Sequence, residues 1–203
     1  MANTKDDIRK ALFDTIPDNF LDPLTLSKPT RETELSGLLA HFHQVGAIDW
    51  SGVPLRDTDG NAIGRPCSEV ISSTDLVVCE YPLFCMSEDD SRIWGDMRAD
   101  LLFISKQRSS VVLVENKIGS EFTGNGDNPE AGQLAKQAYF LIAVQERYKS
   151  FVDCALVVLS AEGYVKRNWY GGGLRETLQV HKRHEKVEGY QLCWEDILRA
   201  IGH

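Results

Sequence analysis

Three charged side chains, Asp100, Glu115 and Lys117, stand where two apolar segments begin and end. Asp100 opens the segment 99–105 (ADLLFIS), Glu115 closes the segment 110–115 (SVVLVE), and Lys117 follows two positions later. If the two segments are adjacent antiparallel strands, the start of one lies beside the end of the other. Residues two apart on a strand project from the same face. The pattern therefore predicts two carboxylates and one ammonium group at a single point.

Such a set suits hydrolysis of a phosphodiester bond. Two carboxylates are hard oxygen ligands for Mg²⁺, which lowers the pKa of a bound water and neutralises charge on phosphate oxygens. Lys117 could orient that water or stabilise the transition state. The backbone carbonyl of Asn116 could add one metal ligand, because its peptide lies between Glu115 and Lys117. A simpler interpretation is a salt bridge at the strand ends, since an ExK tripeptide is common.

The hydrophobic pattern predicts the elements that must position these charges. Apolar residues at helical spacing predict helices over 4–16, 30–46, 131–149 and 194–201, with Thr30 or Thr33 as the N-cap of the second. Strands are predicted over 69–72, 76–86, 99–105, 110–115, 154–160 and 189–193. The short polar turn KQRS makes the third and fourth of these a hairpin. Residues 50–66 are predicted as a loop or hairpin, and Gly171–Gly173 as a flexible turn. This order predicts a mixed central sheet flanked by helices, in an α/β or α+β fold.

Charge is distributed unevenly along the chain. Residues 1–100 carry 9 Lys and Arg against 18 Asp and Glu, whereas residues 101–203 carry 13 against 12. The formal net charge of −8 argues against a protein that coats DNA through a general basic surface. Any contact with nucleic acid must therefore be local, or be helped by metal ions or a partner. The basic run 164–186 is either a solvated loop or a weak nucleic-acid contact through Lys166, Arg167, Lys182 and Arg183.

Length and composition predict one domain over residues 1–203, with 1–29 as a helical and irregular extension and 47–98 as an insertion. The five scattered cysteines include no CxxC pair and predict neither a zinc site nor a disulfide framework. No apolar run approaches the ~18 residues that a membrane helix needs. The charged N-terminus lacks the apolar core of a signal peptide. We therefore expect a cytoplasmic protein without a membrane partner.

Longer stretches around the three charges resemble one enzyme family. RADLLFIS, VVLVENKIGSEF and AGQLAKQAYFL are similar to motifs of the PD-(D/E)xK nuclease superfamily, in the branch with RPD, ENK and QLxxY motifs. The closing YQLCWEDIL resembles the last strand and helix of the same branch. Ala99 replaces the usual Pro, and Gln137 stands where the family often has Tyr. Neither departure touches the two acids and the lysine.

The resemblance implies a restriction-endonuclease-like fold, in which a mixed sheet carries a helix on each side. It implies that Asp100 and Glu115 bind the metal, with Mg²⁺ as the expected ion and Mn²⁺ as a substitute. It also implies that Lys117 is catalytic.

Two supporting residues also follow from the resemblance. The family often has a Gln on the helix after the sheet, which Gln133 matches, and a Glu on the helix before it. The stretch RETELSGLLAHF favours Glu32 for that position, with Glu34 as the alternative. These two lie about 200° apart on a helix, so at most one of them faces the site.

The leading hypothesis is a metal-dependent endonuclease or exonuclease that acts on DNA through a metal-activated water. The second hypothesis is a catalytically weak or inactive nuclease-fold module that binds nucleic acid or a protein partner, which the acidic N-terminal half favours. RNA as the substrate is a third. A homodimer would fit an enzyme that cuts both strands of a duplex.

Overall fold

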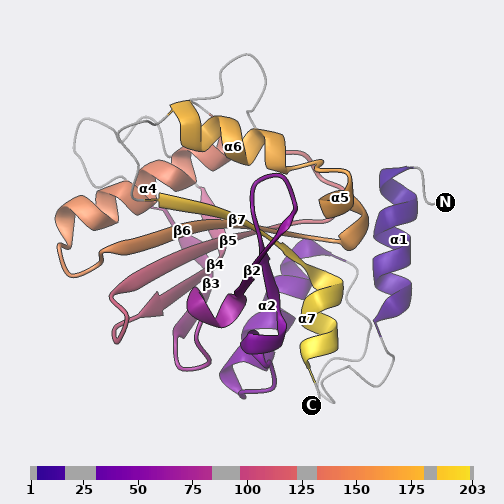
Figure 1. Cartoon of the computed structure of the whole chain (residues 1–203), viewed down its shortest axis with the longest axis horizontal. Helices are drawn as coiled ribbons and strands as arrows, with labels where there is room; N and C mark the ends of the chain where they lie inside the picture. The colour runs from indigo at the N-terminus through magenta and orange to yellow at the C-terminus, as the bar shows by residue number, and fades with distance from the viewer. Residues whose placement is uncertain (1–3, 17–30, 84–96, 123–131, 181–186, 202–203) are drawn as a thin grey trace.

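A seven-stranded mixed β-sheet forms the centre of the molecule (Figure 1). The computed structural model describes residues 4–16, 31–83, 97–122, 132–180 and 187–201. Across the sheet the strand order is β2-β1-β7-β6-β5-β4-β3. The strands are β1 (Pro54–Arg56), β2 (Ala62–Pro66), β3 (Leu76–Pro82), β4 (Arg98–Ser105), β5 (Ser110–Lys117), β6 (Asp153–Ser160) and β7 (Val187–Cys193).

Two kinds of strand pairing meet at β5. Strands β3, β4 and β5 form an antiparallel meander, and the β4–β5 hairpin expected from the sequence is present. Strands β5, β6 and β7 run parallel, which places their carboxyl ends at one edge of the sheet. Strands β1 and β2 form an antiparallel hairpin, and β1 pairs with β7. The mixed sheet that the sequence predicted is thus confirmed.

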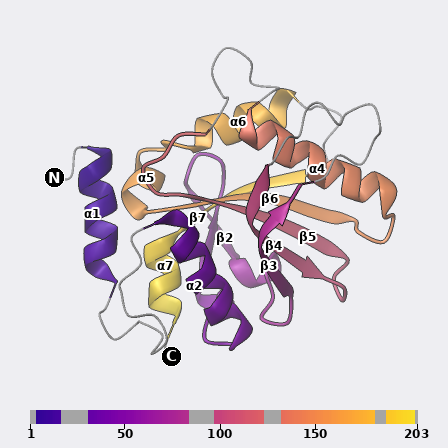
Figure 2. The same cartoon turned by 180° about the vertical axis from the view of Figure 1, so that it is seen from behind.

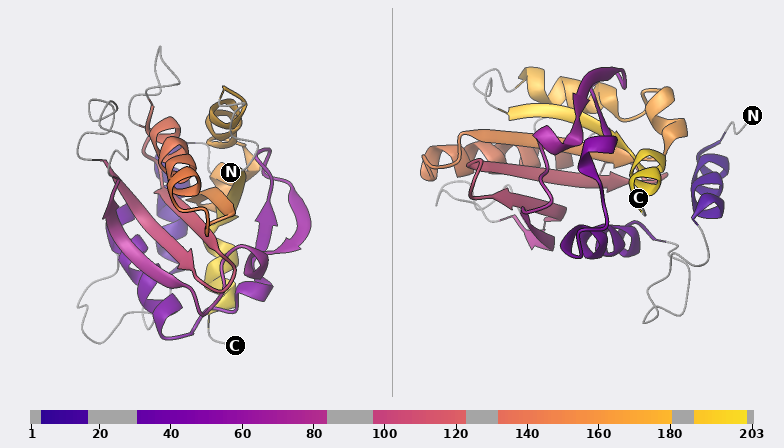
Figure 3. Two further views of the ribbon diagram at one scale, coloured as in Figure 1. Left: turned by 90° about the vertical axis from the view of Figure 1, so that its left-hand side faces the viewer. Right: turned by 60° about the horizontal axis from the view of Figure 1, so that its bottom comes forward.

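Helices cover both faces of this sheet (Figures 2 and 3). Helices α4 and α6 pack on one face against β6 and β7, whereas α2 packs on the other against β3, β4 and β5. Helix α1 lies beside α5 at one end of the molecule, where Ile8 faces Gly163. The helices are α1 (Lys5–Thr15), α2 (Glu32–Gln44), α4 (Gln133–Arg147), α5 (Glu162–Lys166), α6 (Gly171–Val180) and α7 (Trp194–Ala200), with 3₁₀ turns η2 (Trp50–Gly52) and η3 (Cys67–Glu69).

The parallel strands β5 and β6 are covered on both faces, as their nearly continuous apolar sequences require. Every residue of β5 is buried, and in β6 only Asp153 is exposed. Burial therefore extends to the charged end of β5, where Glu115 and Lys117 lie. Charged groups that leave water need partners to offset the loss of hydration. Helix α4 supplies partners for Glu115, and Lys117 pairs with Glu115 itself.

Two predictions about local structure are wrong because backbone groups find other partners. Helix α2 begins at Glu32 and has Arg31 as its N-cap, so Thr33 lies inside the helix; Thr30 lies outside the described residues. Residues 69–72 form the end of η3 and a turn, not a strand. The guanidinium group of Arg108 donates hydrogen bonds to carbonyls in this turn, which takes the place of strand pairing.

The predicted turn at Gly171–Gly173 is also wrong, because these residues begin helix α6. Three glycines in a row have low helix propensity, which is why the sequence indicated a turn. Packing explains the first of them. A Cβ on Gly171 would collide with the side chain of Asn168 and the carbonyl of Thr58, so only glycine allows this close approach.

The two segments expected outside the core contribute to it. Residues 47–98, predicted as an insertion, supply β1, β2 and β3 to the sheet. Within the predicted extension, helix α1 buries Ile8, Leu12 and Ile16 as its apolar stripe predicted. In the part of the chain that the structure describes, no helix is long and apolar enough to cross a bilayer.

Candidate active site at the carboxyl end of strand β5

The two predicted carboxylates lie beside each other on neighbouring strands. Leu101 of β4 pairs with Val114 of β5, so the next position brings Asp100 opposite Glu115. Asp100 Oδ2 accepts a hydrogen bond of 2.7 Å from the backbone N–H of Asn116. The start of β4 thus lies beside the end of β5, as the hairpin prediction required.

Glu115 is buried and held by three donors. Its side chain is only 2% exposed. Oε1 accepts hydrogen bonds from Gln133 Nε2 at 2.5 Å and forms an ion pair with Lys117 Nζ at 2.9 Å. Oε2 accepts a hydrogen bond from Gln137 Nε2 at 2.5 Å. Both oxygens are thus fixed, and Gln133 lies where the resemblance placed it.

Helix α4 provides both glutamines because of its periodicity. Gln133 is the first residue of the helix and Gln137 follows four positions later, one turn along the same face. Gln137 is fully buried, and its Oε1 has no hydrogen-bond partner among the described residues. From the sequence, Gln137 stood out only as a departure from the family pattern. Its spacing from Gln133 was the signal that could have assigned it to the site.

Lys117 shares its face of β5 with Glu115 and is 7% exposed. Its ammonium group lies 5.5 Å from the centre of the Phe122 ring. A cation over an aromatic face is stabilised by the ring quadrupole, and more so away from water. Glu115 and Phe122 therefore confine the charge of Lys117 to the end of the strand. The ion pair is the simpler interpretation that the sequence also allowed.

The carboxyl groups have altered proton affinities. Burial, then the charge of Glu115, raises the pKa of Asp100 to about 7, while the Asn116 N–H and Lys117 oppose that shift. Burial also raises the pKa of Glu115, and Lys117 is the main opposing influence. Two nearby carboxylates that share a poorly hydrated site resist full ionisation together. A positive charge bound between them would favour the ionised form of both.

The side chain of Asn116 points away from the carboxylates and anchors the surrounding helices. Nδ2 donates to the carbonyl of Glu32 at 2.8 Å and to Ser36 Oγ at 3.1 Å, both in α2. Oδ1 accepts from Trp194 Nε1 of α7 at 2.8 Å. The fully buried amide thus ties two helices to the end of β5. Metal ligation by the Asn116 carbonyl stays a prediction.

The choice between Glu32 and Glu34 is decided by their contacts. Glu32 Oε1 accepts from the Ile118 N–H at 2.5 Å, and both of its oxygens accept from Ser120 Oγ. Glu34 is exposed, and its carboxylate accepts from the backbone N–H of Arg31. Glu32 is therefore the residue that faces the end of β5. The partners of its carboxylate, Ile118 and Ser120, are in the segment after β5, so Glu32 braces that segment.

Tyrosine side chains also hold the segment after β5 and the neighbouring helix α1. Tyr170 Oη accepts from the Gly119 N–H at 3.2 Å and donates to the Ser120 carbonyl at 3.0 Å. Tyr164 Oη donates to the Lys5 carbonyl of α1 at 2.7 Å. Tyr170 is thus a buried structural residue.

The predicted nucleic-acid contacts are placed only in part. Lys166 lies in α5 and pairs with Glu162 one helical turn away, at 2.9 Å. Arg167 follows at the end of α5. Lys182 and Arg183 lie outside the described residues. Their part in binding nucleic acid stays a prediction.

One further acid, Glu80 of β3, lies near the site and was not predicted from the sequence. The pairs Cys79–Leu101 and Tyr81–Ala99 place Glu80 directly opposite Asp100 on the neighbouring strand. Its backbone φ is 50°, in the left-handed region that non-glycine residues rarely adopt. Its Oε1 is buried without a hydrogen-bond partner in the described part of the chain. No motif pointed to it, because it stands in an unremarkable strand sequence, LVVCEYP.

The donors at this site fit a hard divalent cation in kind. Asp100 and Glu115 offer carboxylate oxygens, and Gln137 and Glu80 each have a buried oxygen that lacks a donor. As the side chains stand, no three His, Cys, Asp or Glu residues among those described lie close enough to hold one ion together. For these oxygens to bind one cation together, side chains at this end of the sheet must therefore move.

A cavity of about 420 Å³ lies at the opposite edge of the sheet. Its lining includes residues at the amino ends of three parallel strands, such as Ser110, Asp153 and Glu188, together with Arg65 and Arg108. Because β5, β6 and β7 are parallel, this edge is remote from the carboxyl end of β5. The cavity and the carboxylate site are therefore separate features.

Comparison with family models, with curated proteins and with solved structures found no match to this chain. The function must therefore be inferred from the site itself. The site offers two opposed carboxylates, one buried lysine and two glutamines.

Proposed function

We propose that this chain is a metal-dependent nuclease of the PD-(D/E)xK type that hydrolyses phosphodiester bonds, most readily in DNA. The observation that carries the proposal is the meeting of Asp100, Glu115 and Lys117 at the end of one hairpin. A salt bridge alone needs no second carboxylate, yet here the buried Glu115 and the partly buried Asp100 are held together despite their mutual repulsion.

Each residue has a role that its contacts support. Asp100 and Glu115 would hold Mg²⁺ or Mn²⁺. Such an ion supplies charge neutralisation and a more acidic bound water. Gln133 and Gln137 keep the Glu115 carboxylate in one orientation. Lys117 holds its proton beside Glu115, where it can donate to a phosphate oxygen or orient the attacking water.

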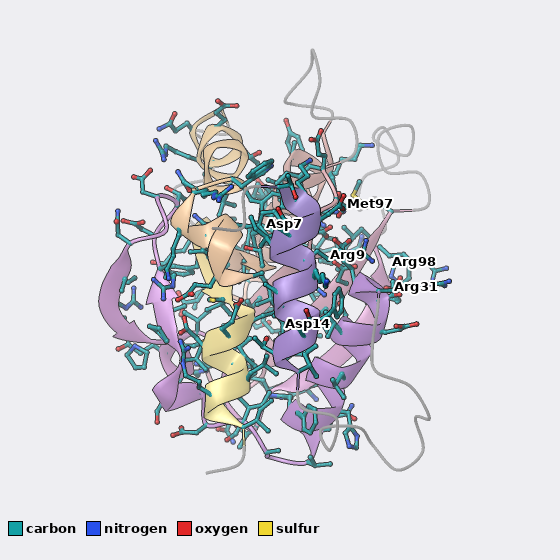
Figure 4. All side chains as sticks on the ribbon, turned by 90° about the vertical axis from the view of Figure 1, so that its right-hand side faces the viewer. Asp7, Arg9, Asp14, Arg31, Met97 and Arg98 are labelled. Atoms are coloured by element: carbon teal, nitrogen blue, oxygen red, sulfur yellow. The ribbon has the colours of Figure 1, made fainter. Side chains whose placement is uncertain are left out.

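Arginines near the site support a polyanionic substrate. Arg31 precedes Glu32, Arg98 stands two residues before Asp100 at the start of β4, and both are exposed. Figure 4 shows Arg31 and Arg98 on the same side of the molecule as Arg9 of α1. Arg9 also reaches the active-site end, because its Cδ lies near Gly119. Such a local group of cations suits an acidic protein that binds a phosphate backbone.

The decisive experiment is cleavage of plasmid and single-stranded DNA in Mg²⁺ or Mn²⁺. The wild-type protein is expected to cut, and Lys117→Ala is expected to cut at least about 100-fold more slowly, because removal of one preorganised charge costs that much in related chemistries. Lys106→Ala, in the exposed β4–β5 turn at the other end of the hairpin, is the matched control. If Lys117→Ala cuts as fast as wild type, the proposed function is wrong.

A second candidate is a nuclease-fold module that binds without turnover. The ion pair of Lys117 with Glu115 favours this candidate, because the ammonium group of Lys117 already neutralises the carboxylate that would otherwise bind a metal ion. This candidate predicts a tight complex with DNA and no cleavage in any divalent metal. Parallel assays with RNA of the same sequence separate the two substrate classes.

A further inference from the structure

Strand β3 places a third carboxylate beside the proposed cation centre. Glu80 stands opposite Asp100 in an antiparallel pair, between the partners Cys79–Leu101 and Tyr81–Ala99. The charge of Glu80 acts on the Asp100 carboxyl group, so the two side chains lie near each other. Glu80, Asp100 and Glu115 therefore occupy one row across three neighbouring strands.

This row is unfavourable in the protein alone. Like charges directly opposite each other on adjacent strands destabilise a sheet. The charge of Glu80 also contributes to the raised pKa of Asp100, after burial and the charge of Glu115. An arrangement that costs stability is expected where it serves binding or catalysis.

Two buried oxygens in this region lack donors. Glu80 Oε1 has no hydrogen-bond partner among the described residues, and neither has Oε1 of Gln137. The Gln137 side chain is fully buried, and its amide lies against Glu115 through the 2.5 Å contact of Nε2. Buried acceptors without partners are rare in folded proteins. A hydrated cation would supply both positive charge and water protons to them.

The family resemblance assigned the extra acid to helix α2, but Glu32 is already engaged there. Its carboxylate accepts from the Ile118 N–H and the Ser120 hydroxyl, and these contacts brace the segment after β5. Glu80 has no such contact through Oε1. Of the two acids, Glu80 is the one that can turn toward Asp100 without breaking a brace.

We propose that Glu80 is the third carboxylate of the cation centre, where it binds a divalent cation together with Asp100 and Glu115, and that Gln137 Oε1 accepts a hydrogen bond from water on that ion. This assignment rests on the proposed function and adds a ligand from β3. Because no three such residues of the described chain yet surround one point, binding includes a rotation of the Glu80 side chain.

The test is calorimetric titration of the full chain with Mn²⁺ in the absence of nucleic acid. Glu80→Gln keeps the size of the side chain and is expected to weaken Mn²⁺ binding at least about tenfold. Glu146→Gln removes an exposed carboxylate near the far end of α4 and is expected to bind like wild type. Equal affinity of Glu80→Gln and wild type would overturn the role of Glu80 and leave the nuclease proposal intact. Absence of Mn²⁺ binding by the wild type would overturn both.

Thermal unfolding gives a second readout that does not depend on activity. In EDTA, Glu80→Gln is expected to melt at a higher temperature than wild type, because the repulsion of Asp100 is removed. With saturating Mn²⁺ the rise in melting temperature should be smaller in Glu80→Gln than in wild type. A variant that melts lower in EDTA and gains as much from Mn²⁺ as wild type would show that Glu80 is structural.

Discussion

Asp100 belongs to the proposed site, and its ionised carboxylate lowers the stability of the folded chain. Its pKa is raised from 3.8 to about 7, chiefly by burial and by Glu115. Well below pH 3.8 the carboxyl group is protonated in both the folded and the unfolded chain. As pH rises toward 7, the unfolded chain releases the proton first, so the free energy of unfolding falls. The loss is complete above about pH 7.

Asp100→Asn is therefore expected to stabilise the protein at pH 8 in EDTA, by about 1–3 kcal/mol, and to have little effect near pH 3.5. The amide oxygen can still accept the hydrogen bond of the Asn116 N–H. Urea unfolding at the two pH values measures the difference, with Asp14→Asn on exposed α1 as the control. A stability gain of the same size at both pH values would contradict this account.

Gln137 is expected to position Glu115 and to act through it. Gln137→Leu removes the donor to Glu115 Oε2, so the pKa of Glu115 should rise further and the cleavage rate should fall about 10–100-fold. The pH–rate profile is the diagnostic measurement, because its acidic limb should move to higher pH. Gln145 lies on the same helix, and its amide donates to the Val152 carbonyl beyond the end of that helix. The control variant Gln145→Leu should leave the pH–rate profile unchanged.

At this scale the sequence predicted the residues that belong to a pattern. Asp100, Glu115 and Lys117 stand at strand ends, and Gln133 matches a motif, so all four were found. Glu80 belongs to no motif, and only the strand register brings it near Asp100. Register is set by tertiary pairing, which single-sequence spacing does not reveal.

Helices and strands hold the site by different means. Strands β4 and β5 align the two carboxylates, and α4 presents two glutamines from successive turns. Helices α2 and α7 are tied to β5 through Asn116. Elements with strong periodicity were predicted well from the sequence, including α1, α4, β5 and β6. Helices α5 and α6 were missed because one is short and the other begins with three glycines.

The glycines of α6 provide a matched pair of variants. Gly171→Ala is expected to destabilise the protein by about 2–4 kcal/mol, because its Cβ would strike the Thr58 carbonyl and the Asn168 side chain. Gly172 has open space around its Cβ position, so Gly172→Ala should stabilise by up to about 1 kcal/mol. Thermal and urea unfolding measure both, and a loss of stability in Gly172→Ala would show that the helix start is misassigned.

For the whole molecule, the relevant feature is the distribution of acidic and basic side chains. The chain has a formal net charge of −8, yet Arg9, Arg31 and Arg98 lie on the side of the molecule shown in Figure 4. Asp7 and Asp14 of α1 also lie in that view, so attraction of a polyanion depends on the edge near β4. A protein with a net negative charge repels most of the DNA backbone, so a small basic region limits non-specific binding to DNA.

Arg31→Ala combined with Arg98→Ala is expected to weaken DNA binding and to reduce the slope of log K against log salt by about 2, one for each lost phosphate contact. Fluorescence anisotropy in EDTA measures binding without cleavage. Arg147→Ala, exposed at the far end of α4, should leave the slope unchanged. An unchanged slope in the double variant would remove these arginines from the binding surface.

Some contacts that complete the sheet join residues far apart in sequence, and this affects the order of folding. The bond from Asn116 to Asp100 spans 16 residues, whereas Gln191 of β7 reaches Thr58 across 133. Local contacts form sooner, because their loops cost less entropy to close. Leu102→Ala in the hairpin should therefore slow refolding, and Leu55→Ala in β1 should mainly speed unfolding, as stopped-flow fluorescence can test. The carboxylates then meet before the sheet is complete, so their repulsion also slows the assembly of the native state.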